Sequence, residues 1–288
     1  MKVIEGCAQV KDRNKGILFM IASSLFFALM AAAVKFSGDI PTMEKVFFRN
    51  IVGCIVSGYA LIKSGDGFKG NNPKYLTYRA FLGFLGVVFY FYAISHLPLA
   101  DAVVLNQMNP FFVVILAALF LREKIKKLQI PAIILALIGV VFIAQPQFNY
   151  TLVPTIAGLL SAIFAASAYT MIRHLSKTDS SHAIVFYFTG ISTIMTIPFM
   201  VFGGFVLPDV ITLISLLTVG IFATLAQYLM TTSYRYAEAG DLSIYSYGNT
   251  IFSIFIGITL WSEIPNVLST VGVIFVLSGA YLNYMAKK

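Results

Sequence analysis

The sequence predicts an all-α, polytopic membrane protein of ten transmembrane helices, built as two inverted five-helix repeats. Of its 288 residues, 59% are hydrophobic and 11% are charged, and the mean hydropathy is +0.86. Soluble domains average about 45–50% apolar and about 25% charged residues, so a soluble or disordered chain is excluded. The other two observations are the number of long apolar stretches and a repeat that relates the two halves.

Each membrane helix needs about 20 mostly apolar residues, and a window of that length finds ten stretches. The expected spans are 16–35, 44–62, 76–95, 101–121, 127–144, 155–174, 183–203, 211–234, 241–261 and 267–285. The first stretch is long for a signal peptide and has no small-residue cleavage site, so we expect it to stay as a span. The short connections leave no soluble domain between the spans.

The distribution of Lys and Arg predicts the orientation of the chain. With the N-terminus inside, 17 of the 20 basic residues fall on the inner side, Lys35 and Lys45 fall outside, and Arg49 lies in the second span. Cytoplasmic loops collect basic residues, so we expect both termini in the cytoplasm and the protein in the inner or plasma membrane. The net charge of +8 thus reflects topology, and we expect no nucleic-acid partner.

The two halves of the chain repeat each other. A shift of 140 residues aligns three polar pairs without a gap: Asp101 with Asp241, Asn109 with Asn249 and Glu123 with Glu263. We therefore expect a first repeat over 1–148, which includes a cytoplasmic N-terminal tail, and a second over 149–288. Five spans per repeat place the second copy upside down, as in many secondary transporters. The alternative is chance similarity between apolar stretches.

Polar residues interrupt the fourth and ninth spans at equivalent depths. The fourth span holds Asn106, Gln107 and Asn109 followed by Pro110, and the ninth holds Tyr245, Tyr247 and Asn249. Pro110 cannot donate to the helical ladder and frees a carbonyl near Asn106, so we expect a kink there. Asn106 and Asn109 share a helix face by their spacing, and Gln107 points elsewhere. This polar segment predicts a substrate site; the alternative is hydrogen bonding between neighbouring helices.

Tyr90 in the third span and Gln227 and Tyr228 in the eighth extend this candidate substrate site. Tyrosine rings in a bundle can stack on a flat ring or hold a quaternary ammonium by cation–π attraction. Tyrosines at helix ends instead belong to the interfacial belt, which is the alternative interpretation.

Arg49 lies about 8 Å from the start of the second span, shallow enough to extend outward to the interface. We expect a structural or gating role for it; the alternative is a clamp on a substrate carboxylate or phosphate. Asp101 and Asp241 begin the fourth and ninth helices, where a carboxylate complements the positive helix end, so their expected role is structural.

Other charged residues, and the motifs that the sequence lacks, restrict the range of possible functions. Lys35, Lys177, His174 and His182 are expected to be solvated at helix ends and in an inner loop. No Asp or Glu lies near the middle of a span, which disfavours a direct proton-competition mechanism. The sequence has no phosphate loop, metal-ligand spacing or Ser-His-Asp arrangement, so we expect no enzyme, no metal and no cofactor.

Several short motifs resemble one family. They are 92–102 (YAISHLPLADA), 121–124 (LREK) and 47–49 (FFR), echoed in the second half by 234–241 (YRYAEAGD) and 261–263 (WSE). Over nearly its whole length the chain resembles the EamA-type members of the drug/metabolite transporter superfamily. It departs from the usual pattern after Glu263, where Ile264 precedes Pro265. The resemblance implies ten-helix carriers of small organic metabolites, and its motifs are nearly silent on the substrate.

The sequence thus predicts a secondary transporter that works without ATP, by alternating access, on a small organic metabolite. An amino acid-like or aromatic compound is slightly preferred, because the spans offer rings and amides but no buried acid. The alternatives are a carrier of a quaternary amine or a nucleoside-type compound, a membrane-embedded lipid-modifying enzyme, and a receptor without transport. The expected partners are the substrate and the lipid bilayer, and the working expectation for the oligomeric state is a monomer.

Overall fold

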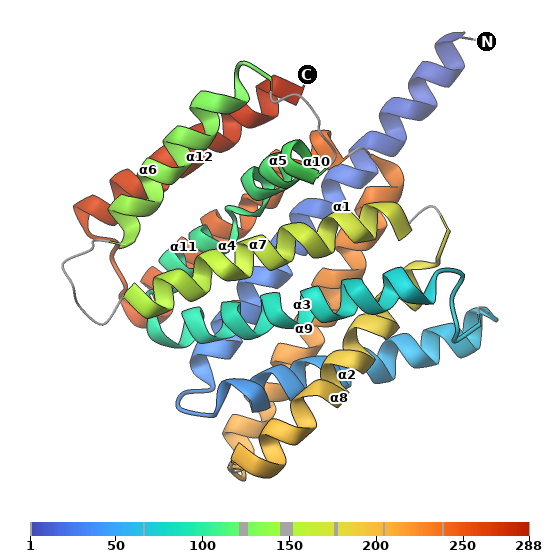
Figure 1. Ribbon diagram of the computed structural model, residues 1–288, viewed down its shortest axis with the longest axis vertical. Helices are drawn as coiled ribbons and strands as arrows, with labels where there is room; N and C mark the ends of the chain where they lie inside the picture. Colours follow the sequence, from blue (N-terminus) through green and yellow to red (C-terminus); the bar gives the residue numbers. More distant parts are fainter. Residues whose placement is uncertain are drawn as a thin grey trace.

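The computed structural model describes residues 2–65, 67–120, 126–144, 152–175, 178–203, 205–237 and 239–287, which form a bundle of α-helices (Figure 1). The helices are α1 (Lys2–Phe36), α2 (Thr42–Ser64), α3 (Pro73–His96), α4 (Leu99–Asn106), α5 (Asn109–Phe120), α6 (Gln129–Ala144), α7 (Leu152–Leu175), α8 (Ser181–Gly203), α9 (Val210–Tyr236), α10 (Ala239–Ser246), α11 (Gly248–Trp261) and α12 (Val267–Lys287).

These helices make ten passes. Eight stretches of the described chain are long and apolar enough to cross a membrane, and one of them, Leu99–Leu116, joins α4 to α5. The shorter apolar helix α6 and the pair α10 and α11 supply the other two passes. The chain is therefore an all-helical, multi-pass membrane protein, as the sequence predicts.

The fourth pass is broken rather than continuous. The sequence predicts one helix over 101–121, whereas α4 ends at Asn106 and α5 begins at Asn109. Pro110 is the second residue of α5, where its missing N–H leaves no helical bond unmade. The expected kink near Pro110 is confirmed, and the expectation of a single helix through this segment is wrong.

The ninth pass is broken at the equivalent place without a proline. The sequence predicts a helix over 241–261, but α10 ends at Ser246 and α11 begins at Gly248, with Tyr247 between them. The break is shorter than in the fourth pass, because one residue instead of two separates the helices, and Tyr247 keeps nearly helical backbone angles (φ −69°, ψ −9°). Each repeat thus contributes one broken pass.

The remaining helices pack mainly in four pairs, each with one member from either repeat: α1 with α9, α3 with α7, α2 with α8, and α6 with α12. Exchange of the repeats converts the pair α1 and α9 into the pair α7 and α3 and leaves the other two pairs unchanged. Such self-consistent pairing is what a pseudo-two-fold axis between the repeats requires.

Glycine contacts show that the counterpart helices α6 and α12 run in opposite directions. A Cβ on Gly139 would lie 2.6 Å from the carbonyl oxygen of Gly272, and a Cβ on Gly279 would lie 2.6 Å from that of Ala132. Gly139, the later of the two α6 residues, therefore meets Gly272, the earlier of the two α12 residues. A shift of 140 residues also converts one contact into the other, so the two repeats are inverted copies in space.

The pair α6 and α12 lies at one edge of the bundle, whereas α4, α5, α10 and α11 lie between the other helices (Figure 1). Seven of the eight residues of α4 are buried. α4 is therefore enclosed by helices of both repeats, whereas α11 keeps an exposed face that includes Ile251, Phe255 and Leu260.

Candidate functional site

The two breaks meet in the middle of the bundle. Gln107 Nε2, just after α4, donates a hydrogen bond to the carbonyl oxygen of Ser246 at the end of α10 (2.5 Å). Asn109 Nδ2 donates to the carbonyl oxygen of Asn106 across the break (2.9 Å), and Asn106 Nδ2 donates to Ser161 Oγ of α7 (2.8 Å). The three polar side chains of the fourth pass thus connect α4, α7 and α10.

The predicted direction of the Gln107 side chain is wrong. Helical spacing places Gln107 away from Asn106 and Asn109, but that geometry assumes an unbroken helix. In the structure Asn109 Nδ2 lies 3.4 Å from Gln107 Oε1, so all three side chains gather at the break.

Four buried polar groups, on α3, on α9 and around the break of the ninth pass, have no hydrogen-bond partner among the described residues. They are Tyr90 Oη of α3, Gln227 Nε2 of α9, Tyr247 Oη and Thr250 Oγ1. The Tyr90 hydroxyl faces the Asn249 side chain without forming a hydrogen bond of normal geometry. A buried polar group without a partner costs about 1–3 kcal/mol, so a cluster of them calls for an explanation such as a ligand.

The other two predicted tyrosines lie apart from this cluster. His182 is partly exposed and its Nδ1 lies 3.3 Å from Tyr228 Oη, so the expected solvation of His182 is only partial. Tyr245 packs against an apolar cluster that includes Met20 and Leu242. Of the predicted site residues, Asn106, Asn109, Tyr90, Gln227, Tyr247 and Asn249 are therefore near the breaks or carry the unpartnered groups.

Two arginines lie inside the bundle. The Arg49 side chain of α2 is 4% exposed and that of Arg79 of α3 is 2% exposed. The central guanidinium carbon is 5.0 Å from the ring centre of Phe188 for Arg49 and 3.8 Å for Arg79. Arg49 therefore packs on α8 inside the protein, and the expectation that it extends outward to the interface is wrong.

Arg79 was not predicted from the sequence to be buried. It is one of the 17 basic residues assigned to the inner side, because basic residues near span ends usually fix the orientation. Its position inside the expected span 76–95, together with the lack of an acidic residue in that span, is the signal that could have identified it.

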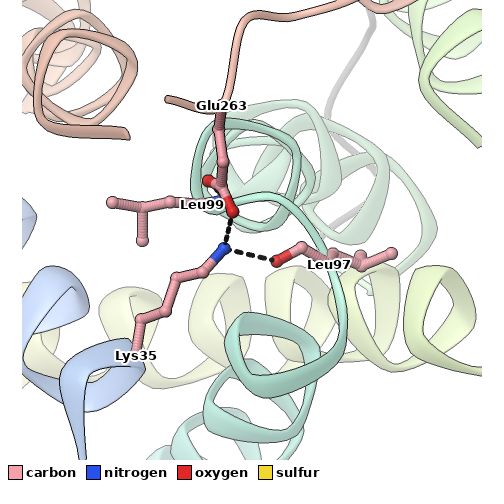
Figure 2. A network of polar contacts seen from close by, with 4 residues as sticks. All are labelled: Lys35, Leu97, Leu99 and Glu263. Carbon is pink, nitrogen blue, oxygen red and sulfur yellow. Dashed lines mark hydrogen bonds and ion pairs between the residues drawn. The ribbon is translucent and has the colours of Figure 1, made fainter. Parts of the chain in front are cut away.

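One ion pair ties both repeats together at the end of the bundle where α1 ends (Figure 2). Lys35 Nζ pairs with Glu263 Oε1 and also donates to the carbonyl oxygen of Leu97 (3.4 Å). Glu263 Oε2 accepts a hydrogen bond from the backbone N–H of Leu99, the first residue of α4 (3.0 Å). The expectation that Lys35 is solvated is therefore wrong, and we call this contact the Lys35–Glu263 latch.

Neither predicted helix-start aspartate occupies the N-cap position, because Asp101 and Asp241 are each the third residue of their helix. Pro98 occupies the N-cap position of α4, and Asp101 lies in the first turn, 8% exposed, where its Oδ2 accepts a hydrogen bond from Ser269 Oγ of α12 (3.3 Å). Asp101 therefore ties α4 to α12 instead of capping the helix. The side chain of Asp241, and Glu123 and Lys177, the counterparts of Glu263 and Lys35, lie outside what the structure describes.

Comparisons with known proteins agree with this architecture. Residues 14–145 and 153–285 each match the EamA-like transporter family. The chain is 35% identical over 268 residues to a pseudopaline exporter of Pseudomonas aeruginosa, which covers 92% of this chain and 94% of the relative. It is 25% identical to a riboflavin transporter of Brucella anthropi over 76% of this chain and 81% of that protein.

A solved structure supports the fold. One crystal structure superposes with a TM-score of 0.69 over 93% of this chain and 96% of its own, at 15% sequence identity. At that identity the likeness shows the fold alone.

Proposed function

Because the chain belongs to the EamA-like transporter family, and is therefore a membrane transporter rather than an enzyme, we propose that it carries a small organic metabolite by alternating access without ATP. The observation that carries this proposal is the meeting of two broken, counterpart passes at the centre of two inverted repeats. Rearrangement of inverted repeats around a fixed central site gives an outward-open and an inward-open form of similar energy.

The side chains at the breaks favour an amino acid-like or aromatic substrate. The unpartnered hydroxyls of Tyr90 and Tyr247 and the amide of Gln227 offer hydrogen bonds next to aromatic rings. The named relatives carry pseudopaline and riboflavin, both small organic compounds, which supports the same broad class. A nucleoside-type compound would use the same rings and amides and is the second candidate.

The surroundings of the site disfavour a quaternary amine. Arg49 and Arg79 place two positive charges inside the bundle, and like charges repel more strongly where little water screens them. We further propose that the protein lies in the cell membrane with both termini in the cytoplasm and acts as a monomer.

Counterflow in proteoliposomes tests the transport proposal. Vesicles that contain the purified protein are loaded with a mixture of unlabelled amino acids, organic acids and nucleosides, and each labelled solute is added outside without ATP. A carrier transiently accumulates at least one labelled solute above its equilibrium level, and only in loaded vesicles. Uptake that does not depend on the internal load, or no uptake of any solute, would contradict alternating-access exchange.

Matched variants connect that transport to the breaks. Asn109→Ala and its counterpart Asn249→Ala should each reduce counterflow, because both side chains lie at the breaks. Asn14→Ala, at an exposed position, is the control and should leave counterflow unchanged.

A further inference from the structure

Arg49 and Arg79 are buried, and each has hydrogen-bond donors without a partner among the described residues. Nε and Nη1 of Arg79 and Nε of Arg49 are fully buried and have no hydrogen-bond partner among the described residues. Arg49 Nη1 has one partner, the neutral side-chain oxygen of Asn50 (2.7 Å). An arginine presents five donors in a rigid fork, so both side chains can accept further oxygen atoms.

Neither arginine has a counter-charge in the part of the chain that the structure describes, where no ion pair involves either one. The two positive charges instead act on each other, and their aromatic neighbours are Phe188 and the neutral Tyr169 of α7. A buried charge without a partner is strongly unfavourable, and a second like charge nearby increases the cost. The arrangement is destabilising for the empty protein, which is typical of a site that a ligand completes.

The direction of the Arg79 side chain supports the same interpretation. Arg79 lies only six residues after the start of α3, about 9 Å, so its side chain could reach the interface by extending backward. It extends forward instead: a Cβ on Gly83, one turn farther into α3, would lie 3.1 Å from Arg79 Nη1 and 2.8 Å from Phe188 Cε2. The missing side chain at Gly83 leaves room for the guanidinium against the ring.

Tyr169 relates the two arginines electrostatically to the groups at the breaks. Tyr169 lies within electrostatic reach of both guanidinium groups and of Tyr90. The Tyr90 hydroxyl in turn faces Asn249 beside the break of the ninth pass. A ligand that contacts the arginines and extends toward the break of the ninth pass would therefore meet Tyr169, Tyr90 and Asn249.

We propose that Arg49 and Arg79 form an oxyanion clamp, which binds a carboxylate or phosphate group of the transported metabolite. This proposal rests on the proposed function, because it names the chemical class of the substrate. The unused guanidinium donors bind the oxygens, the anion neutralises the two charges, and the neutral polar groups toward the breaks contact the rest of the molecule.

Thermal unfolding of the purified protein in neutral detergent tests the clamp with pairs of probes that differ in charge. The pairs are succinate and succinamide, L-phenylalanine and L-phenylalaninamide, and glycerol 3-phosphate and glycerol. At least one probe with a free carboxylate or phosphate group should raise the melting temperature, because a ligand that binds only the folded state stabilises it, and its amide or alcohol partner should not. The first two pairs report carboxylate binding and the third reports phosphate binding.

Arg79→Gln and Arg49→Gln should weaken the apparent affinity for that probe roughly tenfold to a hundredfold, because a hydrogen bond to a charged group is worth about 1.5–3 kcal/mol. Both variants should also raise the melting temperature of the ligand-free protein, because each removes an unpartnered buried charge. A purely structural arginine would have the opposite effect. Arg235→Gln, at an exposed position in the last turn of α9, is the matched control and should change neither quantity.

Three results would overturn the clamp: no stabilisation by any probe with a free carboxylate or phosphate group, stabilisation that survives both glutamine variants, or a lower melting temperature of the ligand-free protein in both variants. Counterflow separates this failure from failure of the transport proposal. If the clamp is wrong and the protein is a carrier, wild-type vesicles still exchange a neutral or cationic solute, and Arg79→Gln leaves that exchange unchanged. If the transport proposal is wrong, wild-type vesicles exchange no solute.

Discussion

Gly139 of α6 and Gly272 of α12 approach each other reciprocally, since a Cβ on either residue would lie 2.6 Å from the carbonyl oxygen of the other. The counterpart contact, between Gly279 and Ala132, has the same spacing. Small residues let membrane helices approach closely, where van der Waals contacts hold them together. Two equivalent contacts of this kind join the repeats along one antiparallel helix pair.

Gly139→Val should destabilise the protein, because the new side chain would collide with backbone atoms that cannot move independently. Overpacking of this kind costs about 1–3 kcal/mol, and Gly279→Val should cost a similar amount by symmetry. Thermal or denaturant unfolding in detergent measures the change. Gly203→Ala, which meets nothing within 4 Å, is the control, and equal stability of all three variants would contradict close packing of α6 on α12.

The Lys35–Glu263 latch joins residues 228 positions apart in the chain, and Lys35→Met should favour the form that is open at this end of the bundle. Both side chains are partly exposed (18% and 23%), so the change in unfolding free energy should stay below about 1 kcal/mol. The readout is therefore accessibility: in a background without native cysteines, Val103→Cys, buried in α4, should react faster with a water-soluble thiol reagent.

The charge exchange Lys35→Glu with Glu263→Lys is the control for the latch, because it restores an ion pair with the opposite polarity. It should return the reactivity of Val103→Cys toward the original rate. If Lys35→Met leaves that rate unchanged, the ion pair does not hold this end closed.

Gln107→Leu should loosen the contact between the two broken passes. The variant keeps the side-chain volume roughly constant but removes the hydrogen bond to the carbonyl oxygen of Ser246. Loss of one such bond typically costs about 0.5–1.5 kcal/mol in stability, and we expect a larger fractional loss in counterflow. Gln9→Leu, in the part of α1 before the first span, is the matched change away from the breaks; equal counterflow in the two variants would count against a role for the contact.

The proposed orientation, with both termini in the cytoplasm, predicts which loops face the cell exterior. Asp39 lies between α1 and α2, and the half-exposed Phe68 lies between α2 and α3, at the opposite end of the bundle. In whole cells that express a variant without native cysteines, an impermeant maleimide should label Asp39→Cys and leave Phe68→Cys unlabelled. The reverse pattern would place both termini outside.

Much of the fold follows from local features of the sequence. Ten apolar stretches predict ten passes because each must satisfy its backbone hydrogen bonds inside the membrane. The alignment of Asn109 with Asn249 predicts polar side chains at the same depth in the fourth and ninth passes, and Pro110 predicts a kink in the fourth through its missing donor. The break at Tyr247 has no comparable local cause in the sequence.

The partners of charged residues could not be predicted in the same way. Periodicity indicates which residues share a helix face, but it does not indicate which distant helix covers that face. The pairing of Lys35 with Glu263 and the packing of Arg79 on Phe188 depend on how the two repeats come together. Arg79 was misinterpreted because a basic residue near a span end has the same pattern whether it faces water or a neighbouring helix.

Alternating access requires the end of the bundle at the Lys35–Glu263 latch to open in every transport cycle. The most direct test joins Lys35→Cys to Glu263→Cys with a short, reducible bifunctional thiol reagent, in a background without native cysteines, and measures counterflow. We predict that the cross-linked protein does not exchange solute and that reduction of the cross-link restores exchange, whereas the single-cysteine variants treated alike stay active. Undiminished counterflow with the two positions joined would contradict transport by opening at this end.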